Sequence, residues 1–194
     1  AKNIFVPEHR VIDLSIEVVP TLRFGGALYR MPTAILPIGI AAVSLGALKA
    51  SLDTLAVLSE NRIPFASSDT LKYRTLSQLH FGRALATYRA ARNFLHSSAQ
   101  QIYDQAVQGE KFDKTARADI VLAGTYAMQT CADAVRETAK AAGTASIHKG
   151  NNIERALRDV EVTSHHAFGS EGRYASVAQA YWGLDVDFPL LGID

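Results

Sequence analysis

The pattern of apolar positions changes character near residue 32. Before it, Val, Ile and Phe are frequent and are interrupted by Pro7 and Pro20, which is typical of short strands and turns. After it, alanine and leucine dominate, and apolar residues recur with the period of an α-helix. The sequence therefore predicts a short stranded segment over residues 1–32 and a helical domain with an irregular tail over residues 33–194.

The helical part reads as an all-α, antiparallel up-down bundle with short loops. Helices are expected over residues 34–59, 71–107 and 114–142, from about 152 into the histidine pair at 165–166, and over 171–182. Asp113 is suited to cap the third helix, and Gly109 and Gly143 to end the second and third. The first helix is apolar on nearly all sides in its first half, so we expect it to be central.

Composition narrows the function classes. With a net charge of +1, the chain lacks the basic excess of a nucleic-acid-binding surface. Its one cysteine, Cys131, excludes a disulfide framework and is expected to be a buried small residue. The longest apolar run, residues 35–48, contains Pro37 and is shorter than the roughly 20 residues of a membrane span. No signal peptide opens the chain, so a cytoplasmic location without membrane contact is expected.

His165 and His166 are the main candidates for chemistry. Adjacent residues on a helix point about 100° apart, so the pair does not form a metal site, and none is expected. The two rings fall on either side of an apolar stripe, and periodicity does not choose between them. Each is either a solvated or interface residue, or an acid, base or hydrogen-bonding group at a cofactor, because histidine titrates near neutrality.

Three segments resemble one family. "AAGTASIHKGNNIERALRDVEVTSHHAF" combines a glycine turn with a helix reading E-R-x-x-R-D, and "IAAVSLGALKASLDTLAVLSENRIPF" ends in an R-x-x-F turn. Together with "NIFVPEHRVI", they resemble the end of the middle β domain and the C-terminal helical bundle of the acyl-CoA dehydrogenase superfamily. The resemblance implies that residues 1–32 are the remnant of that β domain and its linker. The chain is then expected to be a fragment of a longer flavoprotein.

Within this superfamily, the sequence departs from the dehydrogenases at their catalytic base. Their glutamate commonly lies nine residues after the arginine of R-D, which is Ala167 here, and no Asp or Glu stands between Pro20 and Leu52 as an alternative. The chain resembles more closely the oxygenase components of two-component flavin monooxygenases. Their flavin-side histidine lies about eight residues after that arginine, which implies His166, with His165 as the near alternative.

The resemblance also implies a cofactor site. Arg62 and Phe65 match a turn that contacts the flavin's phosphate side from a neighbouring subunit, and Gly143 and Thr144 match a turn that approaches the cofactor. The alternatives are a solvated arginine and a plain helix C-cap. Lys140 replaces a frequent glutamine, which leaves FAD and FMN both open.

The function implied is a monooxygenase or hydroxylase that acts on an aromatic or polycyclic small molecule. It would use O₂ and reduced flavin from a separate reductase, and the bundle would assemble as a homotetramer. The alternatives are an acyl-CoA dehydrogenase with its base elsewhere and a non-catalytic oligomerisation bundle.

Overall fold

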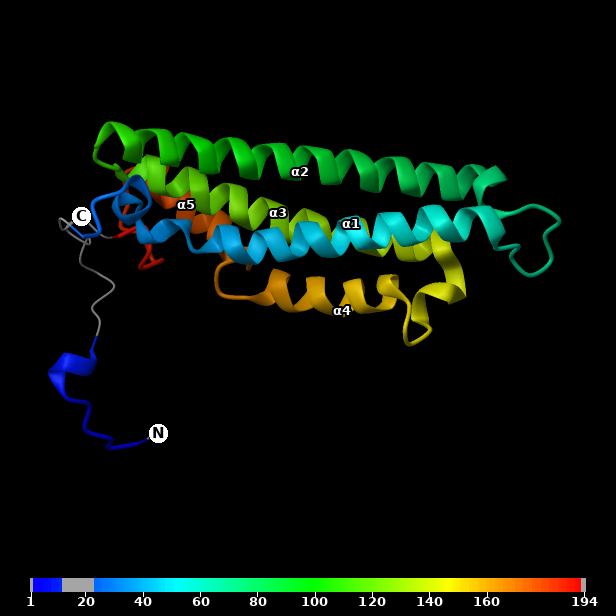
Figure 1. Cartoon of the computed structure of the whole chain (residues 1–194), viewed down its shortest axis with the longest axis horizontal. Helices are drawn as coiled ribbons and strands as arrows, with labels where there is room; N and C mark the ends of the chain where they lie inside the picture. Colours follow the sequence, from blue (N-terminus) through cyan, green and yellow to red (C-terminus); the bar gives the residue numbers. More distant parts are fainter. Residues whose placement is uncertain (1, 12–22, 193–194) are drawn as a thin grey trace.

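The computed structural model describes residues 2–11 and 23–192. The helices in these residues are α1 Pro37–Asn61, α2 Thr75–Gln108, α3 Lys114–Ala142, α4 Asn152–His165 and α5 Gly172–Tyr181. α1, α2 and α3 lie alongside one another, and α4 packs on the side away from α2 (Figure 1). The predicted all-α antiparallel bundle is confirmed.

The ends of α3 follow from its capping residues. The carboxylate of Asp113 accepts a hydrogen bond from the backbone N–H of Ala116 at 2.7 Å, so it satisfies one of the free donors of the first turn. Gly143 follows the last turn with φ 62°, a conformation that favours glycine. Gly109 closes α2 in the left-handed region with φ 72°. Asp113 thus begins α3, and Gly109 and Gly143 end α2 and α3, where the sequence predicts.

α3, and not α1, is the central helix, so the prediction for the first helix is wrong. α3 packs against α1, α2, α4 and α5. Small residues along it allow close approach: a Cβ on Gly124 would lie 2.9 Å from the Cβ of Pro37 on α1. α1 instead keeps apolar side chains exposed on its outer face, among them Val43 at 56% and Val57 at 67%. Apolarity on all sides of a helix therefore did not imply burial on all sides.

Buried hydroxyl pairs join α1 to its neighbours. Ser44 donates to the hydroxyl oxygen of Thr163 on α4 at 2.7 Å, and the hydroxyls of Ser51 and Thr138 on α3 lie 2.5 Å apart. All four side chains are buried and hydrogen-bonded, so none carries the cost of an unsatisfied polar group. The Ser44–Thr163 bond fixes the C-terminal end of α4 against α1.

The front of the chain differs from the prediction where it is described. Residues 2–11 and 23–36 contain short 3₁₀ turns at Glu8–Arg10, Ala27–Arg30 and Thr33–Ile35, and no strand. The remainder of the predicted stranded segment, residues 12–22, lies outside the described residues. A strand needs a partner strand for its backbone hydrogen bonds, and the described part of the chain supplies none.

The apolar helix α1 and Cys131 both contribute to the core. Residues 33–61 are long and apolar enough to cross a membrane by length and composition, but a core helix passes the same test. α1 indeed places Leu45, Leu48 and Leu52 in the bundle core. Cys131 is fully buried on α3, and burial raises its pKa to about 12, which confirms its prediction as a small core residue.

The N-cap of α3 gives a stability prediction. Asp113→Ala should lower the free energy of unfolding by about 1 kcal/mol, since the N–H of Ala116 loses its acceptor. Asp113→Asn retains an acceptor and is the matched control. The N–H of Ala116 and the hydroxyl of Thr115 lower the pKa of Asp113 below 3.8, so its contribution is present above that pH and is lost as pH falls through the lowered pKa. Chemical denaturation checks this, and equal losses in both variants would contradict it.

Candidate functional site

The two histidines lie at the end of α4, in different backbone conformations. His165 is the last helical residue, and His166 is extended with φ −62° and ψ 148°. The pair lies at the end of the helix, as predicted, but the helix includes only His165, and Ala167 belongs to a loop. The apolar stripe of α4 is confirmed for Ile153 and Val160, which are buried, whereas Ala167 is exposed. Both histidine side chains are exposed as well.

The ring of His166 is held by the loop that follows it. The backbone N–H of Phe168 donates to Nδ1 of His166 at 3.2 Å, so Nδ1 accepts this bond with its lone pair and carries no proton. The proton of the neutral ring is then on Nε2. The Phe168 ring meets the imidazole edge-on, with 5.0 Å between the ring centroids. His166 thus presents an N–H donor without having to be charged.

His165 has the opposite arrangement. Its Nδ1 lies 2.8 Å from the backbone carbonyl of Glu161, which can only accept, so Nδ1 carries the proton. In the neutral ring, Nε2 is then an acceptor. The carboxylate of Glu161 is 3.8 Å from the same Nδ1. The two neighbours therefore offer different chemistry, which helix periodicity could not reveal.

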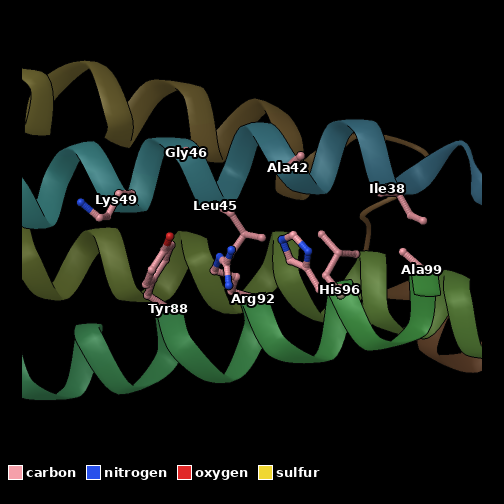
Figure 2. Close-up of a pocket in the computed structure, with 10 residues that line it drawn as sticks. Ile38, Ala42, Leu45, Gly46, Lys49, Tyr88, Arg92, His96 and Ala99 are labelled. Atoms are coloured by element: carbon pink, nitrogen blue, oxygen red, sulfur yellow. The ribbon is translucent and has the colours of Figure 1, made fainter. Parts of the chain in front are cut away.

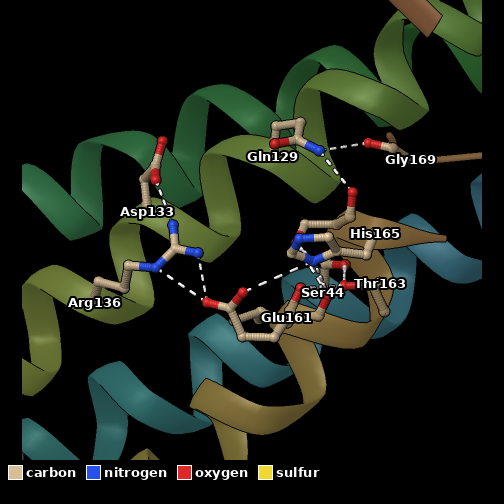
Figure 3. A network of polar contacts seen from close by, with 10 residues as sticks. Ser44, Gln129, Asp133, Arg136, Glu161, Thr163, His165 and Gly169 are labelled. Atoms are coloured by element: carbon tan, nitrogen blue, oxygen red, sulfur yellow. Dashed lines mark hydrogen bonds and ion pairs between the residues drawn. The ribbon is translucent and has the colours of Figure 1, made fainter. Parts of the chain in front are cut away.

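A charge network lies beside His165 (Figure 3). Arg136 on α3 donates to one carboxylate oxygen of Glu161 through Nε at 3.1 Å and Nη2 at 2.5 Å, and to Asp133 through Nη1 at 2.7 Å. All three side chains are partly exposed, so solvent screens these pairs. The network therefore acts mainly by fixing positions: the carboxylate of Glu161 is hydrogen-bonded to the guanidinium of Arg136 and is not a free carboxylate.

The loop itself folds tightly against α3. The backbone N–H groups of Gly169 and Ser170 donate to the carbonyl of His166 at 2.8 and 2.9 Å. A Cβ on Gly169 would lie 2.5 Å from the carbonyl oxygen of Thr163 and 2.6 Å from the sulfur of Met128, so only glycine fits. The Nε2 amide of Gln129 on α3 donates to the carbonyls of Ser164 at 2.8 Å and Gly169 at 2.6 Å (Figure 3).

Sequence reasoning paired Glu161 with His165 by their spacing of four residues, but it missed Gln129 and Arg136. Gln129 contacts backbone carbonyls, which leave no signature in the sequence. Arg136 and Glu161 belong to different helices, and only the packing of α3 on α4 brings them together.

The four predicted cofactor residues lie together, although about 80 residues separate them in the sequence. Arg62, Phe65, Gly143 and Thr144 line one cavity of about 410 Å³. Nη2 of Arg62 donates to the hydroxyl of Thr144 at 3.0 Å. The Phe65 side chain is fully exposed at 103%, where a partner surface or a ligand could cover it.

Further polar groups line the same cavity. Arg74 and Ser77 come from the start of α2, and Lys140 from the end of α3. The ammonium of Lys140 donates to Glu137 at 2.7 Å, and the other oxygen of Glu137 is 2.6 Å from Nδ1 of His80. These contacts lower the pKa of Glu137, Lys140 being the larger cause. Lys140 is thus partly neutralised, while Arg62 and Arg74 keep the cavity cationic.

The segment that leads from α3 into α4 carries Gly143 and Thr144 of the cavity, and the histidine loop follows α4. These two segments lie at opposite ends of α4 (Figure 1). The amide of Asn152, at the start of α4, donates to the hydroxyl of Thr54 at 3.3 Å, near the end of α1 that leads into Arg62. α4 has 14 residues, so its ends are about 20 Å apart at ~1.5 Å per residue. The structure therefore brings the predicted site residues together in two groups and not in one.

One further groove contains none of the predicted site residues. It opens between α1 and α2, with a volume of about 420 Å³ (Figure 2). Leu45 and Leu95 form an apolar floor, and Lys49, Arg92 and His96 stand around it. Among residues 2–11 and 23–192, no group of three or more His, Cys, Asp or Glu side chains could hold a metal ion.

One family model covers more than half of the chain. Residues 38–171 match the family model "Acyl-CoA dehydrogenase, C-terminal domain". An indole-3-acetate monooxygenase of Pseudomonas putida is 25% identical over 144 residues, which are 74% of this chain and 37% of that protein.

Two solved structures share the fold. A 3-HSA hydroxylase from Rhodococcus sp. RHA1 superposes with a TM-score of 0.83 at 21% identity, over 96% of this chain and 49% of that one. XiaF from Streptomyces sp., in complex with FADH2 and glycerol, gives a TM-score of 0.82 at 23% identity, over 96% of this chain and 48% of that one. The chain spans less than half the length of each of these three proteins.

The close packing of Gly169 gives a prediction. Gly169→Ala should destabilise the protein by about 1–3 kcal/mol, because the new methyl group would overlap Met128 and the carbonyl of Thr163. Gly172→Ala is the matched control, since a Cβ there meets nothing closer than 4.0 Å. Thermal and chemical unfolding measure both variants. Similar stabilities for the two would show that the loop has room to move away from α3.

Proposed function

The chain belongs to the family of acyl-CoA dehydrogenase C-terminal domains, and from this premise we propose that it is the C-terminal part of a flavin-dependent monooxygenase. The reaction is the transfer of one oxygen atom from O₂ to an aromatic or polycyclic small molecule. One observation carries the proposal: the loop after α4 presents the N–H donor of His166 directly before Ala167, the position where a dehydrogenase of this fold carries its carboxylate base. The names of the indole-3-acetate monooxygenase and the 3-HSA hydroxylase support the same reaction class.

Dehydrogenation of an acyl-CoA is disfavoured because this part of the chain offers no free carboxylate as a base. Proton abstraction next to a thioester carbonyl needs a base that is free to approach the substrate. Ala167 has none, and the neighbouring Glu161 is held by the guanidinium of Arg136. No other carboxylate lies among residues 162–170.

The Arg62 cavity fits the phosphate end of a flavin nucleotide. Arg62 and Arg74 supply positive charge, and Thr144 and Ser77 supply hydroxyl donors, a set suited to phosphate oxygens. Phe65 and the turn at Gly143 complete the candidate binding residues. The cavity distinguishes neither FAD from FMN, and either is compatible with the proposal. Bound reduced flavin would supply the electrons that activate O₂.

The residues of this chain have separate tasks in the proposed reaction. His166 donates a hydrogen bond from Nε2 to the developing negative charge on oxygen. Phe168 contacts the imidazole and helps to orient it. His165 has no such donor on Nε2 and is the second candidate.

The separation of the two groups supports a homo-oligomer in which one subunit's Arg62 cavity serves the histidine loop of another. We propose a homotetramer, with a flavin reductase as the partner that supplies reduced flavin, and a cytoplasmic location. Residues 1–32 are then the end of a middle β domain and its linker, and residues 33–194 the C-terminal bundle with its tail.

The main test compares the two histidines in the intact enzyme. With reduced flavin, O₂ and no substrate, the interval between O₂ uptake and H₂O₂ release should shorten about tenfold or more in His166→Ala, because the N–H donor is lost. His165→Ala is the matched control and should stay within about twofold of the parent. Stopped-flow absorbance and a peroxide assay measure the interval.

Other outcomes of this test are also decisive. If only His165→Ala shortens the interval strongly, the hydrogen-bond donor is His165 and not His166. No effect in either variant would make the pair structural. An acyl-CoA thioester added without reductase and without O₂ should leave the oxidised flavin unbleached, and bleaching would establish the dehydrogenase instead.

A second prediction concerns the cofactor cavity. Arg62→Ala should raise the dissociation constant for flavin about tenfold or more, since a charge-assisted hydrogen bond to phosphate is lost. Arg92→Ala removes the same charge from the groove between α1 and α2 and should leave the constant unchanged. Titration followed by flavin fluorescence measures both, and equal effects would contradict a specific role for Arg62.

A further inference from the structure

We propose that Gln129 is a positioning residue that holds the histidine loop, residues 166–169, in the one arrangement in which His166 keeps its proton on Nε2. The proposal rests on the function proposed above, because it assigns Gln129 a role in the action of His166. Gln129 itself touches neither imidazole in the contacts described. It acts through the backbone that carries them (Figure 3).

The amide of Gln129 bridges the two ends of the loop. It donates to the carbonyl of Ser164, just before the histidine pair, and to the carbonyl of Gly169, just after it, at 2.8 and 2.6 Å. A single NH₂ group carries two protons in a fixed plane, so it can satisfy both carbonyls at once. A methionine of similar length has no proton to donate, and a glutamate would place a carboxylate against two carbonyl oxygens.

Neighbouring residues of α3 form the rest of the support. The buried Thr125 hydroxyl donates to the carbonyl of Phe168 at 3.3 Å, and the Met128 sulfur lies where a side chain on Gly169 would otherwise stand. The Phe168 ring also packs edge-on against Phe188, with 6.0 Å between the ring centroids. The carbonyls of Phe168 and Gly169 are therefore both fixed to α3, and the bond from Gln129 to Gly169 is the shorter of the two.

The fixed backbone at Phe168 and Gly169 determines which nitrogen of His166 carries the proton. The N–H of Phe168 occupies Nδ1 of His166 only while the loop keeps its turn. If the carbonyl of Gly169 is released, the loop can rotate and either ring nitrogen can hold the proton. The exposed imidazole would remain, but its N–H donor would be present for only part of the time. Loss of Gln129 thus weakens His166 without removing it.

The test uses the intact protein with Gln129→Met. The matched control is Thr130→Val, one position further along α3, which also removes a side-chain bond to a backbone carbonyl, that of Tyr126 at 2.7 Å. The first measurement is amide hydrogen exchange of the peptide that contains Phe168, Gly169 and Ser170, without added flavin. The second is the interval between O₂ uptake and H₂O₂ release, in each variant and in the double variant Gln129→Met with His166→Ala.

In Gln129→Met, exchange at residues 168–170 should rise about fivefold to tenfold, and the interval should shorten, while Thr130→Val changes neither. The double variant should show the interval of His166→Ala alone, because both changes act on the same donor. Unchanged exchange would overturn the proposal, as would additive effects in the double variant. A normal interval in Gln129→Met would also overturn it if His166→Ala shortens the interval.

Failure of the proposed function has a different signature. In that case His166→Ala alone would leave the interval at the parental value, and a positioning role for Gln129 in catalysis would fall with it. The exchange measurement would still report whether Gln129 holds the loop. The interval in His166→Ala therefore tests the proposed function, and the amide exchange in Gln129→Met tests the role of Gln129 without flavin.

Discussion

The packing of four helices on α3 is the constraint on which the rest of the structure depends. Alanine, glycine and threonine residues along α3 let α1, α2, α4 and α5 approach it together. The same helix supplies Thr125, Met128 and Gln129 beneath the histidine loop, and its last turn leads into Gly143 at the Arg62 cavity. One element thus fixes the core and both halves of the candidate site.

Much of the fold could be predicted from the sequence because helix ends have local causes. Asp113, Gly109 and Gly143 act within one turn of their own positions, and their roles are confirmed. The order of the helices in space could not be derived in the same way. α1 is apolar on all sides in its first half, yet α3 is central, because small residues on α3 allow close approach and the outer face of α1 stays exposed.

The candidate site was predictable only where a motif marks it. The resemblance brought forward Arg62, Phe65, Gly143 and Thr144, and the structure places these residues around one cavity. The helix end near the histidine pair was predicted, but the departure of His166 from the helix was not, because it depends on backbone contacts with the following loop. Helix periodicity therefore could not separate the two imidazoles, whereas their hydrogen bonds to Phe168 and Glu161 do. The separation of the Arg62 cavity and the histidine loop by the length of α4 is likewise a property of packing. Because of this separation, the proposed reaction needs the cavity of one subunit beside the loop of another.

A crystal structure of the whole protein with bound flavin tests the account most directly, through the distance from Nε2 of His166 to the flavin ring. The account predicts that this nitrogen lies within hydrogen-bonding reach of the ring edge where O₂ reacts, about 3 Å from the oxygen position, with Arg62 of another subunit at the phosphates. A flavin bound away from the loop after α4, or a His166 ring directed to solvent beside an occupied site, would contradict it.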